Sequence, residues 1–348
     1  MKMKDMRQRM PGIYEVRLSA NQNSIDEINI FLIPGKKGER SLMIDAGFKK
    51  RSCLAKMEKV LFTLGITYDK LDIFLTHKHH DHSGLASEYA SLGARILMNP
   101  EENRHHYDCL YYNHDHGTDE DQYRVLRSVG VTPEGTPEIW EMFMEIRRRV
   151  MENRGWEFEV HQFPYMPVME GQVLNYGNLT FEAVLLKGHT YGQMGLYERK
   201  HRILFCADQV IDGIVPIVGT TYPDEHLLEG YFKSLERFKH EFADCTLFPA
   251  HREPITDVKK VVNRIIFAYL DKTDIMKHIL DRSKRRMTTK EVACLAYGME
   301  NIPEDTKEFI KLKMVMSKTF SCLEYLRDMD FAIRTEENGT YYWQSPEL

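Results

Sequence analysis

Four histidines and one aspartate occur within six consecutive residues, directly behind the largely apolar run Leu71–Leu75. Imidazole nitrogens and carboxylate oxygens are groups that bind zinc and similar divalent ions in proteins. Side chains of an extended backbone alternate in direction, so we expect His77 and His79 to point the same way and bind one ion together. Asp81 and His82 then face a neighbouring position. Because this segment follows a strand and not a polar tail, it predicts a metal site.

Three further polar residues each follow an apolar, strand-like run: His189, Asp208 and His251. Loops at strand ends are where a rigid scaffold presents functional groups. Any one of the three alone would be typical of a turn or capping residue. Together with the histidine segment they supply nitrogen and carboxylate ligands without a thiolate.

The bulk composition gives no support for several classes of protein. The 348 residues carry a formal net charge of -5, with 43% hydrophobic and 28% charged residues, which gives no basic footprint for nucleic acid. Six scattered cysteines form no Cys-x-x-Cys pair, so neither a disulfide framework nor a thiolate zinc site is indicated. No run of 18 apolar residues occurs. We expect a cytoplasmic protein that does not interact with a membrane.

The chain alternates between strand and helix patterns, which predicts an α/β fold. We expect a catalytic domain over 1–255 with a helical insertion at about 100–165, and a smaller, mainly helical, winged-helix-like domain over 256–348. The expected strands lie at 14–18, 28–33, 41–45, 71–75, 94–98, 172–174, 179–186, 195–197, 202–205 and 245–248. Helices are expected to begin at 85–90 and to lie at 52–64, 137–150, 226–240, 257–281, 288–298 and 306–328, before a hairpin at 331–343.

The insertion is crowded with aromatic residues, and two interpretations stay open. An aromatic lid would suit a partly apolar acyl substrate, whereas the same side chains could form the insertion's own core or a dimer contact. The insertion also holds four histidines, which we assign to loops or the surface in preference to the pocket: His105, His106, His114 and His116.

At these motifs the chain resembles the metallo-β-lactamase superfamily of metallohydrolases. Residues 77–82 match the H-x-H-x-D-H motif of that family, and the three later ligand residues follow in the right order. The resemblance covers roughly residues 12–255 and implies an αββα sandwich. The insertion and the C-terminal region resemble those of glyoxalase II and related thioesterases or lactonases.

The resemblance implies a complete set of seven ligands for two ions. One ion is bound by His77, His79 and His189, the other by Asp81, His82 and His251, and Asp208 bridges them. Asp45 matches the first acidic motif, which supports the metal loop. Ala207 replaces a frequent glycine, and Arg252 stands where many members have a glycine beside the last histidine. Arg252 would serve either a structural salt bridge or a wall that recognises an anion.

Such a centre implies hydrolysis by a metal-bridging hydroxide, with two divalent ions. We favour zinc, although the ligands also suit iron or manganese. Asp81 is a candidate for passing a proton to the leaving group. The expected substrate is a small molecule containing a thioester, lactone or other acyl ester, and the protein could be a homodimer.

Three alternatives remain open at this point. The first is a nuclease or phosphodiesterase of the same fold, for which the local cluster Lys284–Arg286 is weak support against the acidic balance. The second is an iron-dependent oxidoreductase, although redox members of the family have Glu where this chain has His79 and carry an added flavin domain. The third is a binding module that keeps the metal without turnover.

Overall fold

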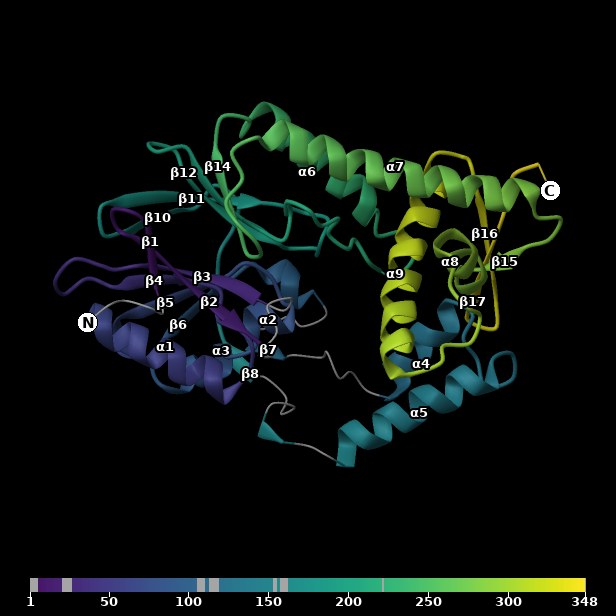
Figure 1. Ribbon diagram of the computed structural model, residues 1–348, viewed down its shortest axis with the longest axis horizontal. Helices are drawn as coiled ribbons and strands as arrows, with labels where there is room; N and C mark the ends of the chain where they lie inside the picture. Colours follow the sequence, from purple (N-terminus) through teal and green to yellow (C-terminus); the bar gives the residue numbers. More distant parts are fainter. Residues whose placement is uncertain are drawn as a thin grey trace. The chain divides into compact units, whose positions relative to one another are not determined.

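The computed structural model describes residues 6–20, 27–104, 110–112, 119–152, 155–156, 162–220 and 222–347. The chain forms two compact units (Figure 1). The first, here called the sandwich unit, comprises Met1–Asp115, Val160–Pro216 and Ser234–Val262. The second, the helical unit, comprises His116–Glu159, Ile217–Lys233 and Asn263–Leu348. The domain boundaries expected from sequence, 1–255 and 256–348, stay a prediction.

The first sheet of the sandwich unit has seven strands in the order β1-β2-β3-β4-β5-β6-β9. Its strands are β1 (Arg7–Met10), β2 (Ile13–Ser19), β3 (Glu27–Ile33), β4 (Ser41–Ile44), β5 (Leu71–Leu75), β6 (Arg95–Met98) and β9 (Met166–Pro167). Strands β1 to β4 form an antiparallel meander, and β5, β6 and β9 continue it in parallel with β4. The parallel step from β4 to β5 needs a crossover, which is made by α1 (Arg51–Leu64) and η1 (Tyr68–Lys70).

The second sheet has five strands in simple chain order. These are β10 (Val173–Tyr176), β11 (Leu179–Leu185), β12 (Met194–Glu198), β13 (Ile203–Ala207) and β14 (Thr246–Pro249). All neighbours are antiparallel except β13 and β14, which are parallel and are connected through α6 (Leu227–His240).

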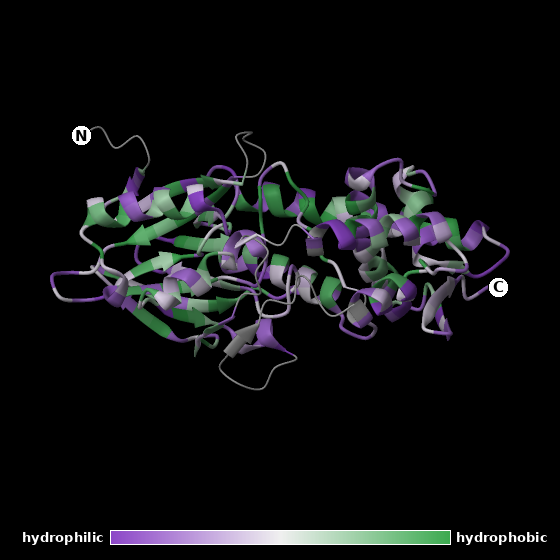
Figure 2. Cartoon of the chain, turned by 90° about the horizontal axis from the view of Figure 1, so that it is seen from below, coloured by the Kyte–Doolittle hydropathy of each residue, from purple (hydrophilic) through white to green (hydrophobic). Residues whose placement is uncertain are grey.

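Apolar side chains of both sheets share one buried core, as the hydrophobic strands in Figure 2 indicate. Phe31 of the first sheet lies 4.9 Å from Phe205 of the second, measured between ring centroids. Helices α1 and α3 (Ala86–Ser91) pack against the first sheet. On the second sheet, Tyr197 packs against Phe242, just after α6, at 5.2 Å. The expected αββα sandwich is therefore confirmed.

The helical unit contains most of the C-terminal part of the chain. Its elements include α7 (Val258–Arg282, which begins in the sandwich unit), α8 (Thr289–Tyr297), α9 (Thr306–Asp328) and a sheet of order β15-β17-β16, formed by β15 (Met287–Thr288), β16 (Ile333–Glu337) and β17 (Thr340–Gln344). Trp343 is fully buried and donates to Thr289 Oγ1 at 2.9 Å, which attaches the sheet to α8. The expected helices and hairpin are confirmed, and the winged-helix-like description stays a prediction.

The insertion is helical over α4 (Asp119–Ser128) and α5 (Pro137–Glu152). It also holds elements that the sequence patterns did not predict: η2 (Pro100–Asn103) and the paired strands β7 (Leu110–Tyr112) and β8 (Gln162–Pro164). Tyr123, Trp140 and Phe143 pack on one another, and Phe143 lies 6.2 Å from Phe309 of α9. Phe143 is buried in the helical unit, whereas Tyr123 and Trp140 are half-buried beside it. His105, His106, His114 and His116 lie outside the described residues.

Candidate metal centre

The histidine segment leaves the sheet at the carboxyl end of β5 and changes conformation within the motif. Strand β5 ends at Leu75, Lys78 and His79 lie in a bend, and the short helix α2 (His80–Ser83) then begins. The amides of His82 and Ser83 both donate to the carbonyl of His79, at 3.0 and 2.9 Å. The helical turn, and not continued alternation, therefore presents Asp81 and His82. Gly84 follows because a Cβ there would lie 2.4 Å from the His80 carbonyl oxygen and 2.6 Å from the Lys49 nitrogen.

Two buried imidazoles, His77 and His189, and the half-buried imidazole of His79 form the first cluster. His79 Nδ1 lies 3.0 Å from His77 Nε2 and 3.0 Å from His189 Nε2. Burial, followed by the neighbouring imidazoles, holds the pKa of His77 and of His79 well below the ordinary value. Both rings are therefore neutral at physiological pH and offer lone pairs, as a metal ligand must.

The second cluster combines one carboxylate with two imidazoles. Asp81 Oδ2 lies 3.6 Å from His82 Nε2 and 3.4 Å from His251 Nε2. Asp208 stands between the clusters. Its Oδ1 lies 3.6 Å from His82 Nε2 and 3.5 Å from His251 Nε2, and its Oδ2 lies 3.6 Å from His189 Nε2. Ligands at about 2.0–2.1 Å from a tetrahedral ion are roughly 3.4 Å apart, which matches these separations.

Unsatisfied polar atoms show that the residues fit a cation. Among the described residues, His82 Nε2 and Asp208 Oδ1 are buried without a hydrogen-bond partner. Leaving such atoms unpaired costs free energy, and an ion bound between them would satisfy both. Oxygen and nitrogen donors suit zinc, manganese or iron. Ligation by the seven residues stays a proposal.

The other nitrogen of several imidazoles is held by a neighbouring group. His82 Nδ1 lies 2.8 Å from Asp45 Oδ2, and His251 Nδ1 lies 2.6 Å from the Glu27 carbonyl oxygen. His77 Nδ1 lies 3.1 Å from Thr76 Oγ1. The backbone amide of Thr76 donates to Asp45 Oδ1 at 2.8 Å. Such partners fix ring orientation and direct the free nitrogen toward an ion. Asp45 thus contacts the metal loop as its motif position implies.

Opposite charges balance one another at the second cluster. Burial lowers the pKa of His251, but Asp208 and Asp81 outweigh it and raise that pKa to about 10. Burial likewise opposes ionisation of Asp208, yet His251 and His82 hold its pKa well below the ordinary value. The carboxylate is therefore ionised, and an incoming divalent ion would displace imidazole protons.

Glu102 is a buried carboxylate that the sequence patterns did not single out. Its Oε2 accepts a hydrogen bond from the Lys78 amide at 2.8 Å. Its Oε1 accepts from Thr190 Oγ1 and from the Gly192 amide, both at 2.6 Å. One side chain therefore connects the segment that holds His77 and His79 to the loop that holds His189. No local signal predicts it, because its partners are distant in sequence.

Three residues other than glycine adopt left-handed backbone angles beside the cluster residues. Asp45 has φ 65°, Ala207 has φ 49° and Arg252 has φ 71°. Ala207 directly precedes Asp208, so the structure explains why glycine is frequent at that position. Strained backbone of this kind concentrates at functional sites.

Arg252 was expected to form either a salt bridge or an anion-recognising wall. Among the described residues it forms no ion pair, whereas its neighbour Glu253 accepts from Arg9 at 2.9 Å and also pairs with Arg17. The exposed Arg252 side chain lines a cavity of about 440 Å³, and His251 and Asp212 line the same cavity. The salt-bridge alternative is therefore not supported.

Comparison with known proteins identifies the class. The model of the metallo-beta-lactamase superfamily matches residues 26–251, and the chain belongs to that superfamily. The family match and the histidine and aspartate clusters together define a metal-dependent hydrolase.

Individual relatives are distant but match nearly the full length. The chain is 20% identical over 327 residues to the probable metallo-hydrolase YqjP of Bacillus subtilis (strain 168), with 92% of each chain covered. It is similar to the crystal structure of a metallo-beta-lactamase family protein of Thermus thermophilus, with a TM-score of 0.74, 20% identity, and 97% and 100% coverage. A beta-lactamase domain protein of Burkholderia ambifaria gives a TM-score of 0.76, 16% identity, and 98% and 94% coverage. At these identities the two solved structures show the fold alone. Among the described residues, no helix is long and apolar enough to cross a membrane.

Proposed function

We propose that this chain is a binuclear hydrolase whose two divalent ions, most suitably zinc, are held by the seven residues described above. The observation that carries the proposal is the overlap of three ligand groups on shared residues. These groups are His77, His79 and His189; His77, His82 and Asp208; and Asp81, His82 and His251. Asp208 approaches both imidazole clusters, which suits a carboxylate that bridges two ions.

Bound ions at this centre would acidify a water molecule and polarise the carbonyl group under attack. The chain's own residues have separate tasks. Asp45 holds the His82 ring through Nδ1, and the Glu27 carbonyl holds His251 in the same way. We assign to Asp81 the transfer of a proton to the leaving group, because its carboxylate is partly exposed at the site and lies 3.4 Å from His251 Nε2.

A thioester, lactone or other acyl ester is the proposed substrate. The 440 Å³ cavity beside His251 is within the size range of small-molecule sites and contains Ile214 and Pro254 as well as charged groups. Such a mixed lining suits a partly apolar acyl group near a polar reacting centre. The printed description of the Bacillus subtilis relative, a probable metallo-hydrolase, agrees with hydrolysis and names no substrate.

A nuclease activity is less well supported by the helical unit. The local basic cluster at 284–286 is largely neutralised, because Arg285 pairs with Glu291 at 2.6 Å and Arg286 pairs with Glu337. Neutralised cations release few counterions from a phosphate backbone and so contribute little to nucleic-acid affinity. The glyoxalase II-like subtype, a homodimeric state and a cytoplasmic location stay predictions.

Two measurements test the proposal together. Metal content is measured on protein purified without added metal, and hydrolysis of a thioester, a lactone, bis-p-nitrophenyl phosphate and RNA is measured in parallel. We expect two ions per chain and acyl-ester turnover. Cleavage of the phosphodiester or RNA without acyl-ester turnover would overturn the substrate class.

The bridging role of Asp208 has its own variant. Asp208→Ala should reduce the metal content below two ions per chain and remove hydrolysis, because both clusters lose a shared ligand. Asp244→Ala is the matched control, since Asp244 is exposed and pairs only with Arg202 among the described residues. A variant Asp208→Ala that retains both ions would show that the bridging assignment is wrong.

A further inference from the structure

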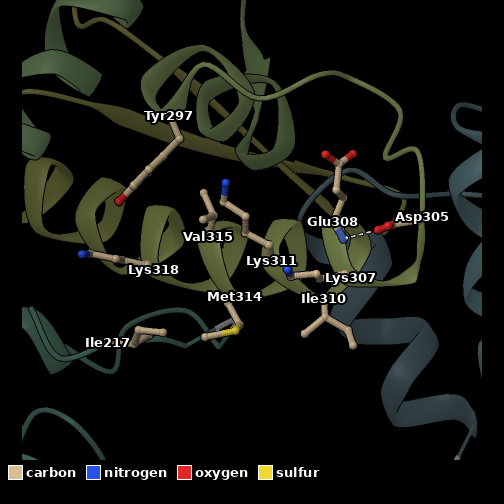
Figure 3. A pocket seen from close by; sticks show the side chains of 10 residues that line it. All are labelled: Ile217, Tyr297, Asp305, Lys307, Glu308, Ile310, Lys311, Met314, Val315 and Lys318. Carbon is tan, nitrogen blue, oxygen red and sulfur yellow. Dashed lines mark hydrogen bonds between the residues drawn. The ribbon is translucent and has the colours of Figure 1, made fainter. Parts of the chain in front are cut away.

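The helical unit contains a pocket of about 740 Å³ along one face of α9 (Figure 3). Residues from α9, the end of α8 and the segment at Ile217 line it. Its volume lies within the range of small-molecule sites. None of its lining residues is among the seven candidate ligands.

Part of the wall is apolar. Ile310 and Met314 are 51% and 47% exposed to solvent, and Val315 and Ile217 continue the same surface. Covering apolar side chains on a concave surface with an apolar ligand removes them from water and so favours binding.

Three lysines occur on the pocket side of the same helix. Lys307, Lys311 and Lys318 are spaced by four and seven residues, which places them on one helical face. Within the described part of the chain, none of the three pairs with a carboxylate. The two acids that line the pocket are engaged with backbone amides at the start of α9: Asp305 accepts from the Glu308 amide at 2.8 Å, and Glu308 accepts from the Glu304 amide at 2.9 Å.

Tyr297 and Lys318 provide the polar groups at one end of the pocket. The Tyr297 hydroxyl oxygen is buried and forms no hydrogen bond to any described residue. Figure 3 shows it at the same end of the pocket as the Lys318 ammonium, with Asp305 at the opposite end. The Lys318 ammonium lies 4.5 Å from the centroid of the Tyr269 ring.

Two observations show that this end favours an anion. Burial lowers the pKa of Lys318, an effect that Cys322 opposes and Lys272 reinforces, and no carboxylate among the described residues pairs with the ammonium. Lys272 itself lies 4.6 Å from the Tyr297 ring centroid and adds a second positive charge. An anion accepting from Lys318 and Tyr297 would satisfy both donors at once.

We propose that this pocket binds a small organic carboxylate with an apolar body, its carboxylate between Lys318 and Tyr297 and its body along Ile310, Met314 and Val315. A divalent cation is opposed by the lysines, and an inorganic anion would leave the apolar wall in water. Lys307 and Lys311 attract the ligand to the pocket through their charge.

Calorimetric titration of the full, metal-loaded chain with octanoate tests the proposal. Octylamine, octan-1-ol and inorganic phosphate are titrated in parallel. We expect saturable binding of octanoate only. Equal binding of octylamine or octan-1-ol would show that no anion is recognised, and equal binding of phosphate would show that the apolar wall contributes nothing; each result overturns the proposal.

Variants locate the bound octanoate. Lys318→Met should weaken octanoate binding by about tenfold or more, and Tyr297→Phe by roughly fivefold, because each removes a buried donor. Lys284→Met, an exposed lysine outside the pocket, should leave binding unchanged. Unchanged affinity in Lys318→Met would place octanoate elsewhere, the metal centre included, and would overturn the proposal.

Met314→Asp provides a second variant, chosen because residue 314 is half exposed and tolerates a polar side chain. Its added negative charge should abolish octanoate binding while the melting temperature stays close to that of the parent protein. Retained binding in this variant contradicts the proposed site even if Lys318→Met does not fold.

Discussion

At the scale of single residues, the candidate metal centre includes residues other than glycine whose backbone is left-handed, a conformation that costs free energy. Ala207 has φ 49° and directly precedes Asp208, whereas Ala250 directly precedes His251 and has no left-handed φ. A left-handed conformation costs an ordinary L-residue about 1–2 kcal/mol. The two alanines therefore form a matched pair, one strained and one unstrained.

Replacing each of these two alanines by glycine should change the stability of the protein in opposite directions. Ala207→Gly should stabilise the protein by about 0.5–1 kcal/mol, because glycine adopts the native angle without the steric penalty. Ala250→Gly should destabilise it by a similar amount, since there glycine only adds freedom to the unfolded chain. Urea denaturation of both variants measures the change, and equal signs would contradict the assigned strain.

Residue type and spacing singled out the histidine segment and three residues that follow apolar runs, His189, Asp208 and His251. The assignment of seven ligands to two ions came from the family resemblance and stays a prediction. Glu102 could not be predicted, since its partners Lys78, Thr190 and Gly192 are brought to it by the tertiary fold. The helical turn at His80–Ser83 was also missed, because the four histidines in the segment give no apolar periodicity.

At the scale of secondary-structure elements, Glu102 at η2 connects two loops that carry ligands of the same cluster. Its carboxylate accepts three hydrogen bonds, and a Cβ on Gly192 would lie 2.8 Å from the Glu102 nitrogen, so the loops approach closely. Glu102→Gln replaces one accepting oxygen by an NH₂ group that faces other donors. We expect it to weaken the ion bound by His77, His79 and His189 by about 10–100-fold.

Metal titration against a competing chelator measures this effect separately for each ion. Glu101→Gln is the matched control, because the neighbouring side chain is 57% exposed and pairs with Arg104. Equal weakening of both ions would indicate general destabilisation and would contradict the positioning role of Glu102.

Strand β5 carries another buried carboxylate, close to its amino end. Asp72 is 1% exposed and accepts from Arg40 Nε at 2.6 Å, from Arg95 Nε at 2.7 Å and from the Tyr176 hydroxyl at 2.8 Å. Tyr176 belongs to the second sheet, so Asp72 links the two sheets. Burial opposes ionisation, yet Arg95, Arg40 and Tyr176 outweigh it and hold the pKa of Asp72 below its ordinary value.

Asp72→Asn should therefore destabilise the protein by about 2 kcal/mol at neutral pH, because the partly exposed arginines lose a charged partner. Because the pKa of Asp72 is lower in the folded than in the unfolded state, its carboxylate stabilises the fold at pH values above the unfolded pKa of about 3.9. That contribution is lost as the pH falls through the folded pKa. The difference between parent and variant should thus shrink below about pH 4. Denaturation from pH 7 to pH 3 checks this, with the exposed Asp69→Asn as control.

At the scale of the whole chain, the alternation of strand and helix patterns predicted an α/β fold, whereas the αββα sandwich was implied by the family resemblance. The association of insertion residues 116–159 with the C-terminal helices was not predictable, because it depends on contacts such as that between Phe143 and Phe309. Local patterns carry no information about such distant packing. The same limit applies to the pocket along α9, whose wall comes from three separate segments.

Within the sandwich unit, the seven candidate ligands come from both sheets. The histidine segment follows β5 of the first sheet, whereas His189, Asp208 and His251 follow β11, β13 and β14 of the second. Ions bound between them would cross-link the two layers. A ligand that binds only the folded state at 1,000 times its Kd stabilises it by about 4 kcal/mol.

Removing the ions with a chelator should accordingly lower the melting temperature, and by less in Asp208→Ala than in the parent. The pH dependence follows from His251, whose pKa is raised to about 10 in the metal-free protein. Because its pKa is higher in the folded than in the unfolded state, protonated His251 stabilises the metal-free protein fully below the unfolded pKa of about 6.5. This contribution is lost as the pH rises toward 10. The difference in melting temperature between metal-loaded and metal-free protein should therefore widen from pH 6.5 to pH 9. Calorimetric scans across that range measure it, and a difference that narrows would contradict the proposed ligation by His251.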